Sequence, residues 1–495
     1  MSQPPAPTAP TATIDPAQLA ALRQSLQQAF EGRMLTDDDD MVPFLSDWRG
    51  RYHGRALAVT QPDDAEQVRK VVQWCIDNDF RIVPQGGNTG LAGGATPDAS
   101  ERNVIISLAR MRSVRAIDPI NNTITVDAGC TLLEVKEAAA KAKRLFPLTL
   151  PSEGSCTIGG NLSTNAGGCG VLRYGNAREL CLGLEVVTPA AEIWGGLRGL
   201  RKDNTGYDLR DLFVGAEGTL GIVTGATLKL HPEPVVTLTA LAALESPRHA
   251  LKLLELAQKH LSASLTAFEM IADICIDFVA RHHPECPRPF AEPSPYYVLL
   301  ECSDAESQEH ATERFETLLN EALETELITD AVISDSLART KALWALRENI
   351  SEAQAAVGKN IKHDISVPIS QIGDFVEQTN AELEAAFPGI RMVVFGHLGD
   401  GNLHYNVSPP AEREGPAFEE EFLALQPEMN RITHDAVVRF GGSISAEHGL
   451  GVLRRDESAR YKSATELRLM KAVKAAIDPD GRMNPGKVLP PSAAA

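Results

Sequence analysis

Three glycine-rich segments, each next to a predicted strand, constrain this chain more than any other feature. Residues 84–94 include five glycines, residues 151–168 form a second cluster, and residues 215–223 form a third. Glycine lets a backbone approach a ligand closely with successive N–H groups turned inward, as a pyrophosphate requires. One such segment could be a surface turn, but three beside strands predict a loop system that binds a polar ligand. The pattern G-x-G-x-x-G is absent, which argues against the two-halved dinucleotide-binding fold.

The order of predicted elements divides the chain, whose 495 residues are too many for one core. Helices are predicted at 18–30, at 63–78 with Asp63 as N-cap, and at 132–143. Strands are predicted at 56–60, 81–84, 104–107 and 123–127. Near Pro232 the pattern changes to amphipathic helices at 247–261, 306–323 and 336–357, with strands such as 297–301. This second part predicts an antiparallel sheet with helices on one face, hence an α+β fold. A last helix is predicted at 464–477.

Composition excludes several classes of protein. The net charge of −19 argues against a nucleic-acid partner, because phosphate binding needs a basic surface. The eight cysteines contain no C-x-x-C pair, so we expect reduced thiols. No apolar stretch is long enough to span a membrane. The first twenty residues lack Lys, Arg and an apolar core, so we expect a disordered arm at 1–14 and a cytoplasmic location.

The segment 395–407, FGHLGDGNLHYNV, carries the strongest chemical signal. Asp400 and Gly401 predict a two-residue hairpin turn between apolar strands. That turn would place His397 directly opposite His404, with Cβ atoms roughly 4.5–5.5 Å apart. Two imidazoles at this separation can share one divalent ion, and Asn406 would lie on the same face as His404.

A second segment, 443–451, places a carboxylate beside another histidine. Glu447 could complete a His₂Glu metal site that keeps an open position, and His448 would then serve as a base. From the residues alone, a zinc hydrolase with structural glycine loops and a non-catalytic flavoprotein electron carrier both stay open.

Residues 56–489 resemble the FAD-binding family typified by vanillyl-alcohol oxidase and p-cresol methylhydroxylase. The similarity is greatest to its 2-hydroxy-acid dehydrogenase branch, which includes D-lactate, glycolate-oxidising and D-2-hydroxyglutarate dehydrogenases. The resemblance implies a two-subdomain FAD-binding domain at 15–234, split near residue 113. It also implies an antiparallel-sheet substrate (cap) domain at 235–440 and a C-terminal segment, 441–495, that returns to the FAD domain.

The resemblance also implies where FAD is held. Some members attach the flavin through a histidine in the first loop, but Asn88 stands at that position, so a non-covalent flavin is expected. The residues implied to contact FAD are Pro84, Gly86, Gly87, Asn88, Thr89, Gly90, Leu91, Pro151, Gly154, Ser155, Ile158, Gly159, Gly160, Asn161, Thr164, Asn165, Gly168, Glu217, Gly221, Ile222, Val223 and Asn484.

Substrate residues are likewise implied by the resemblance. From spacing, Arg347 and Ser351 lie one helical turn apart and Lys362 lies in a predicted strand, and this spacing favours ordinary surface charges. The hydroxyglutarate-type members place an Arg, a Thr and a Lys here to hold the substrate's carboxylates, with Ser351 standing for the Thr. The same members bind zinc through the residues matching His397, His404 and Glu447. The residue matching His448 abstracts the proton, and the one matching Asn406 contacts the substrate.

Together these features predict an FAD-dependent dehydrogenase that oxidises a D-2-hydroxy acid. Lys362 favours the dicarboxylate D-2-hydroxyglutarate, with D-lactate or glycolate as the alternative substrate. The electron acceptor is left open between an electron-transfer flavoprotein and a quinone, and a homodimer is left open as well.

Overall fold

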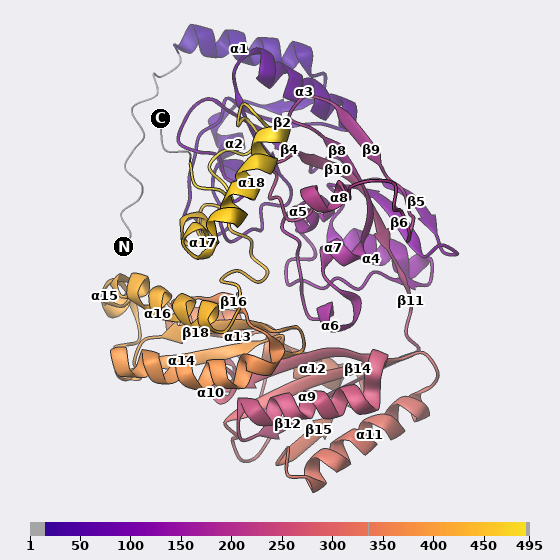
Figure 1. The fold of residues 1–495 in the computed structure, drawn as a ribbon, viewed down its shortest axis with the longest axis vertical. Helices are drawn as coiled ribbons and strands as arrows, with labels where there is room; N and C mark the ends of the chain where they lie inside the picture. Colours follow the sequence, from indigo (N-terminus) through magenta and orange to yellow (C-terminus); the bar gives the residue numbers. More distant parts are fainter. Residues whose placement is uncertain (1–14, 335, 492–495) are drawn as a thin grey trace. The chain divides into compact units, whose positions relative to one another are not determined.

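The computed structural model describes residues 15–334 and 336–491, and these form two compact units (Figure 1). The glycine-loop unit comprises residues 15–167, 175–233 and 447–491. The seven-stranded unit comprises residues 168–174 and 234–446. The short segment 168–174 belongs to the seven-stranded unit, and the chain then passes between the units after Glu233, where the composition changes, and again after Ala446. The expected arm at 1–14 lies outside the described residues.

The glycine-loop unit contains two main sheets. A four-stranded sheet has the order β1-β2-β4-β3, and β4 runs parallel to both β2 and β3. A five-stranded antiparallel sheet has the order β5-β6-β10-β8-β9, and β7 pairs with β11. The first sheet ends before residue 108 and the second begins at Val114, next to the expected split. The strands are β1 (Arg33–Leu35), β2 (Ala58–Gln61), β3 (Arg81–Gln85), β4 (Asn103–Ser107), β5 (Val114–Asp118), β6 (Thr123–Asp127), β7 (Arg144–Leu145), β8 (Cys181–Val187), β9 (Ile193–Gly196), β10 (Ile222–Lys229) and β11 (His231–Pro232).

Helix α3 shows how the sequence forms this unit. Val68, Val71, Val72 and Cys75 are all buried, at the spacing that puts one helix face against a sheet. The N-cap is Asp64, whose carboxylate accepts from the N–H of Gln67 at 2.8 Å. The prediction of Asp63 as N-cap was wrong, because the helix begins two residues later than expected. The helices are α1 (Pro16–Ala29), α2 (Asp38–Leu45), α3 (Ala65–Asp77), α4 (Leu132–Lys141), α5 (Ile158–Ser163), α7 (Ala177–Leu180), α8 (Arg210–Phe213), α17 (Arg455–Tyr461) and α18 (Ala464–Ile477).

The seven-stranded unit is built on one antiparallel sheet, which confirms the predicted α+β fold. The strand order is β15-β12-β14-β13-β17-β18-β16. The strands are β12 (Val236–Leu244), β13 (Leu265–Ala272), β14 (Tyr296–Asp304), β15 (Asp330–Ile333), β16 (Asp364–Ser366), β17 (Arg391–Gly396) and β18 (Asn402–Ser408). The helices are α6 (Val171–Tyr174), α9 (Pro247–Leu261), α10 (Asp273–His282), α11 (Gln308–Glu324), α12 (Leu337–Glu348), α13 (Ile350–Val357), α14 (Ile372–Ala386), α15 (Glu419–Ala424) and α16 (Gln426–Arg439).

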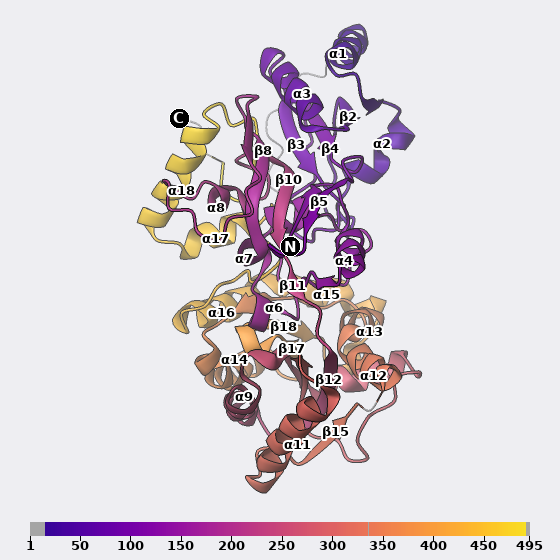
Figure 2. The ribbon, with the colours of Figure 1, turned by 90° about the vertical axis from the view of Figure 1, so that its right-hand side faces the viewer.

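Helices cover both faces of this sheet, not one as predicted. Ile271 and Leu299 point to the face where α10, α12 and α13 pack. Their neighbours Met270 and Val298 point to the opposite face and are equally buried. Figure 2 shows α9, α14 and α16 on one side of the strands and α12 and α13 on the other. Because both faces are apolar, both need a cover of helices.

The predicted helix 336–357 is two helices that meet at Asn349, whose ψ of −5° ends α12 and starts α13. Both halves bury apolar residues in the same core, including Leu346 and Ile350. The predicted helices 247–261 and 464–477 are confirmed residue for residue. All eight cysteines are free thiols. Among the described residues, no helix combines the length and apolar character needed to cross a membrane.

Candidate functional site

The first glycine loop follows β3, and several of its backbone N–H groups make no hydrogen bond to any residue that the structure describes. Within the described part of the chain, no backbone N–H from Gly87 to Leu91 donates a hydrogen bond to the protein. Asn88 adopts the left-handed conformation with φ of 52°. Its side-chain amide donates to the carbonyls of Pro43 and Ser46, at 3.1 and 2.8 Å. The loop is therefore shaped by the protein while its N–H groups stay available, which is the arrangement that binds a phosphate group.

The second glycine loop packs directly against the first. A Cβ atom on Gly87 would lie only 2.0 Å from the carbonyl oxygen of Ser155. Thr157 then caps α5, and the N–H groups of Ile158 and Gly159 donate to the carbonyls of Cys130 and Ala128, which follow β6, at 2.9 and 2.8 Å. The buried amide nitrogen of Asn161 has no hydrogen-bond partner in the protein. The two loops thus form one surface in this unit, and the side-chain amide of Asn161 is a buried donor that a bound ligand could use.

Glu217 in the third loop has a structural partner. Its buried carboxylate accepts from the N–H groups of Leu450 and Gly451, at 2.7 and 2.8 Å. Burial raises the pKa of this carboxyl, and these two hydrogen bonds offset part of that rise. Asn484 donates to the carbonyls of Gly94 and Glu217, at 2.8 and 2.7 Å. These two residues therefore tie the loops to the C-terminal segment.

The other residues expected to contact FAD lie in the glycine-loop unit, with the exception of Gly168. Asn165 accepts from the N–H of Arg178 at 2.9 Å and so also holds its own loop. Gly168 belongs to the seven-stranded unit. The remaining members lie in the glycine-loop unit, in or beside the three loops: Pro84, Gly86, Thr89, Gly90, Leu91, Pro151, Gly154, Gly160, Thr164, Gly221, Ile222 and Val223. The free N–H groups of the first loop fit the pyrophosphate of FAD, because they are donors without protein acceptors.

In the seven-stranded unit, the hairpin differs from the prediction in its register. Strand β17 ends at Gly396 and β18 begins at Asn402, so the turn has five residues instead of two. His404 lies opposite Phe395, not opposite His397. Leu398 is fully buried within the turn, and Gly401 closes it with φ of +90°. Burial of that leucine, which the Asp-Gly pattern does not show, lengthens the turn and shifts the pairing by two residues.

Because the shift is two residues, the two histidines still meet. Their ring centroids are 5.8 Å apart and the rings are nearly perpendicular. His397 is buried and His404 is half-buried. The structure therefore brings His397 and His404 together within one unit, as diagonal neighbours rather than as a direct pair.

A buried glutamate that sequence reasoning missed links His397 to Arg347. Oε1 of Glu269 lies 2.6 Å from Nδ1 of His397, and its Oε2 accepts from Nε of Arg347 at 2.8 Å. Burial alone would raise the pKa of Glu269, but the charges and hydrogen bonds of His397 and Arg347 lower it to about 2. The signal that could have identified Glu269 is a charged residue inside the fully buried and largely apolar strand LTAFEMIA.

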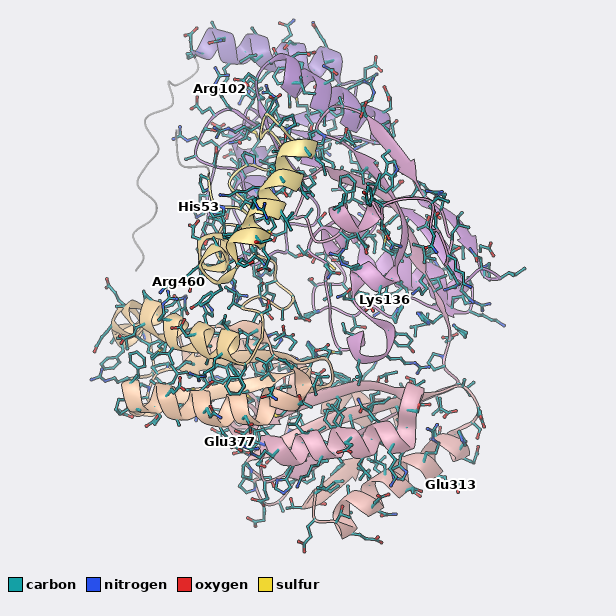
Figure 3. The ribbon with its side chains drawn as sticks, viewed as in Figure 1. His53, Arg102, Lys136, Glu313, Glu377 and Arg460 are labelled. Atoms are coloured by element: carbon teal, nitrogen blue, oxygen red, sulfur yellow. The ribbon has the colours of Figure 1, made fainter. Side chains whose placement is uncertain are left out.

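Arg347 is the substrate candidate whose environment differs most from the expectation based on spacing. It is only 8% exposed, and its guanidinium lies 4.8 Å from the ring centre of Phe395. By contrast, charged side chains on the helices that cover the sheet, such as Glu313 and Glu377, are exposed at the surface (Figure 3). Arg347 is therefore not the surface charge that spacing alone favours, and its role in substrate binding stays a prediction. Ser351 is exposed, so the two do not share one buried face.

Lys362 and Asn406 lie opposite each other. Strand β16 covers Asp364–Ser366, fewer residues than the predicted strand 361–367, and Ile361 pairs with Val407 as an isolated bridge before it. The register is nevertheless unbroken, since Ile361 pairs with Val407 and Asp364 with His404. Asn406 is buried and donates to Gln354 of α13 at 3.0 Å. Lys362, Asn406 and His404 therefore occupy the same face as Glu269 and His397.

Cys169 lies near His397, and the last residue of the seven-stranded unit, Ala446, lies near His404. Ligand atoms of Cys169, Glu269 and His397 lie within 4.8 Å of one another, and burial raises the pKa of the Cys169 thiol. The N–H of Ala446 bonds to the carbonyl of Asp364 at 3.3 Å, so the chain leaves this unit beside His404. Glu447 and His448 are the next two residues and begin the last part of the glycine-loop unit.

Comparison with known proteins supplies the family. Residues 56–195 match an FAD binding domain, and residues 233–488 match the C-terminal domain of FAD linked oxidases. D-2-Hydroxyglutarate dehydrogenase from Xanthomonas citri pv. viticola is 39% identical over 94% of this chain and 96% of its own length. The mitochondrial D-2-hydroxyglutarate dehydrogenase of Bos taurus is 37% identical over 94% of this chain and 83% of its own. A Schizosaccharomyces pombe mitochondrial protein provisionally named a D-lactate dehydrogenase is 35% identical over 91% and 85%.

Solved structures agree at the level of the fold. p-Cresol methylhydroxylase with substrate bound aligns with a TM-score of 0.73 at 16% identity, over 97% of this chain and 99% of that one. The 4-ethylphenol oxidase of Gulosibacter chungangensis aligns with a TM-score of 0.72 at 18% identity, over 97% and 99%. With both domain families matched in order and full-length relatives well above 30% identity, the chain belongs to the FAD-linked oxidase family that includes these D-2-hydroxyglutarate dehydrogenases.

Proposed function

We propose that this protein is an FAD-dependent dehydrogenase that oxidises D-2-hydroxyglutarate to 2-oxoglutarate with the help of a bound divalent metal, zinc. The observation that carries the proposal is the buried polar end of the seven-stranded sheet, where Arg347, Glu269 and His397 form one hydrogen-bonded group. Buried charge in an apolar core is costly unless it is paired, and it marks functional sites. Relatives named for this activity support the choice of substrate.

The donor set fits zinc. Nδ1 of His397 is engaged by Glu269, which leaves Nε2 as the ligand atom. His404 supplies a second imidazole nearby, and Glu447 is proposed as the third ligand. Ala446 supports this choice, because it is bonded beside His404's partner Asp364 and Glu447 follows it directly. Two imidazoles and a carboxylate leave a coordination position open, and the bound metal would lower the pKa of the substrate hydroxyl.

The remaining side chains have distinct proposed roles. His448 accepts the hydroxyl proton as general base. Arg347 presents a planar fork to a carboxylate, and its direction is fixed because Glu269 holds Nε. Lys362 neutralises the distal carboxylate, and Asn406, opposite it, offers an amide to the substrate. Ser351 is retained as a weaker candidate, since its side chain is exposed.

FAD, when bound at the glycine loops, would accept the hydride from C2. We propose that it is held without a covalent bond, because the amide of Asn88 is not a nucleophile and donates to two carbonyls. Acid precipitation would then leave all the flavin in the supernatant. The electron acceptor, a homodimer and a cytoplasmic location stay predictions.

A D-lactate dehydrogenase is the second candidate, favoured by the Schizosaccharomyces pombe relative. The test is anaerobic reduction of the flavin by a panel of D- and L-2-hydroxy acids. We expect D-2-hydroxyglutarate to bleach the flavin absorbance fastest and L-2-hydroxyglutarate to leave it unchanged. Faster bleaching by D-lactate would replace the dicarboxylate assignment. No bleaching by any 2-hydroxy acid would favour an electron carrier. A purified protein without flavin would support the zinc hydrolase.

A further inference from the structure

Glu269 has no assigned part in the reaction, yet it is the most deeply buried charge in the seven-stranded unit's polar cluster. Its side chain has no solvent exposure. Each of its two oxygens is engaged by a different cationic or ionisable partner, His397 on one side and Arg347 on the other. Its neighbours along β13, Phe268 and Met270, are apolar and buried. A carboxylate is retained here only if both partners need it.

We propose that Glu269 is a positioning residue that fixes the metal ligand His397 and the substrate-binding Arg347 through one shared carboxylate. This inference rests on the proposed function. Hydrogen bonding of Nδ1 to a carboxylate sets the tautomer and the rotation of an imidazole, so that Nε2 points away with its lone pair toward a metal ion. With Nε of Arg347 on the other oxygen, the guanidinium plane is set by the same group.

Phe395 makes a further contact with Arg347. The guanidinium of Arg347 lies 4.8 Å from the centre of its ring, and the ring of His404 lies 4.9 Å from it. Arg347 thus contacts both Glu269 and Phe395, and each of these also contacts one of the two histidines. The geometry couples the carboxylate-binding arginine to both imidazoles through a rigid, buried group.

Replacement of Glu269 by Gln tests the shared carboxylate. Glutamine has one acceptor oxygen and one donor nitrogen. If its oxygen stays with Nε of Arg347, its NH2 faces Nδ1 of His397 and favours the tautomer with the proton on Nε2, which cannot bind zinc. If its oxygen stays with His397 instead, Arg347 loses its acceptor. We expect the zinc affinity of the FAD-loaded Glu269→Gln protein, measured by competition with a chromophoric chelator, to fall roughly 10- to 100-fold. At saturating zinc, we expect kcat to recover while KM for D-2-hydroxyglutarate stays raised, because Arg347 is no longer oriented.

Glu301→Gln is the matched control. Glu301 lies in β14, next to β13, and is held by neutral donors, namely Trp344 at 2.9 Å, Thr266 at 3.2 Å and Thr239 at 3.3 Å. The same chemical change there should leave zinc affinity and KM unchanged. Glu269→Asp keeps the carboxylate but shortens it, so we expect its zinc affinity to lie between those of the unaltered protein and Glu269→Gln.

Cys169 provides the competing explanation, because it adjoins Glu269 and His397 in a group that could itself hold an ion. If Glu269 acts only by positioning His397 and Arg347, Cys169 is not a zinc ligand, and Cys169→Ser should leave zinc affinity unchanged. A loss as large as that of Glu269→Gln would make Glu269 a direct ligand at that group and overturn the positioning role.

The outcomes separate the inference from the function. Zinc affinity of Glu269→Gln equal to that of the unaltered protein, with normal melting temperature and FAD content, overturns the inference alone. If Glu269→Gln does not fold, Glu269→Asp with unaltered zinc affinity overturns it instead. If the unaltered protein binds zinc but oxidises no hydroxy acid, the proposed function fails while the zinc comparison still decides the role of Glu269. If it binds no zinc, the metal site and the positioning role of Glu269 fail, while flavin reduction by D-2-hydroxyglutarate still decides the substrate.

Discussion

Arg347 and Lys362 show how two basic residues of similar appearance in the sequence acquire different environments. Arg347 is buried and paired with Glu269, so its loss would leave one oxygen of a buried carboxylate without its cationic partner. Lys362 is half-buried at a position fixed opposite Asn406. A substitution at Lys362 should therefore change mainly substrate binding, whereas a substitution at Arg347 would also lower the stability of the fold.

Lys362→Met separates the dicarboxylate from the lactate assignment. Methionine keeps most of the apolar stem and removes the charge. A hydrogen bond to a charged group contributes about 1.5–3 kcal/mol, so kcat/KM for D-2-hydroxyglutarate should fall by about one to two orders of magnitude. D-Lactate, which has no distal carboxylate, should be nearly unaffected where it is turned over. Steady-state kinetics with both acids check this, and equal losses for the two would make Lys362 structural or a ligand of the C1 carboxylate.

At the scale of elements, the glycine loops depend on backbone contact between segments far apart in the chain. Gly87 and Ser155 come from different loops, and no side chain can fit between them. The hairpin of β17 and β18 depends in the same way on a buried turn residue, Leu398. In both cases the packing of one element on another, and not its own residue pattern, sets the final geometry.

Gly87→Ala should disturb the contact between the first two loops. The added Cβ would lie 2.0 Å from a backbone oxygen, so the backbone itself must move. We expect the free energy of unfolding to fall by about 1–3 kcal/mol and FAD to bind more weakly. Thermal unfolding and bound-flavin absorbance measure the two effects. Gly195→Ala in β9, where nothing lies within 4 Å of the added atom, is the control. Equal stability of the two variants would contradict the close approach.

At the scale of the whole molecule, the two candidate ligand sets belong largely to different units. The glycine loops lie in one unit, and His397 and His404 lie in the other with their own buried core. Each unit has its own sheets, so loss of one ligand need not release the other.

Chelation should therefore abolish turnover without releasing FAD. Metal ions bind to deprotonated ligand atoms and can be withdrawn by a stronger chelator, while the flavin loops keep their contacts. We expect flavin absorbance to stay with the protein on gel filtration, and zinc to restore activity. His404→Ala should reproduce the chelated state. Full activity in protein shown to be metal-free by elemental analysis would remove the metal from the mechanism.

The sequence by itself determined the elements whose signal is local. Helices α9 and α18 were predicted at their observed bounds, because the apolar periodicity and the cap residues lie within the helix itself. The three loops, the two histidines and the FAD family were likewise readable, since glycine clusters and histidine spacing are properties of short segments.

Only the tertiary structure decided how the site is supported. Glu269 and His397 are 128 residues apart, and Glu269 and Arg347 are 78 apart, so no local pattern records that they meet. A glutamate has the same chemistry at a surface and in a core until its neighbours are known. The register of the hairpin was mispredicted for this reason, and spacing alone did not show that Arg347 is buried, since both features arise from packing between distant strands and helices.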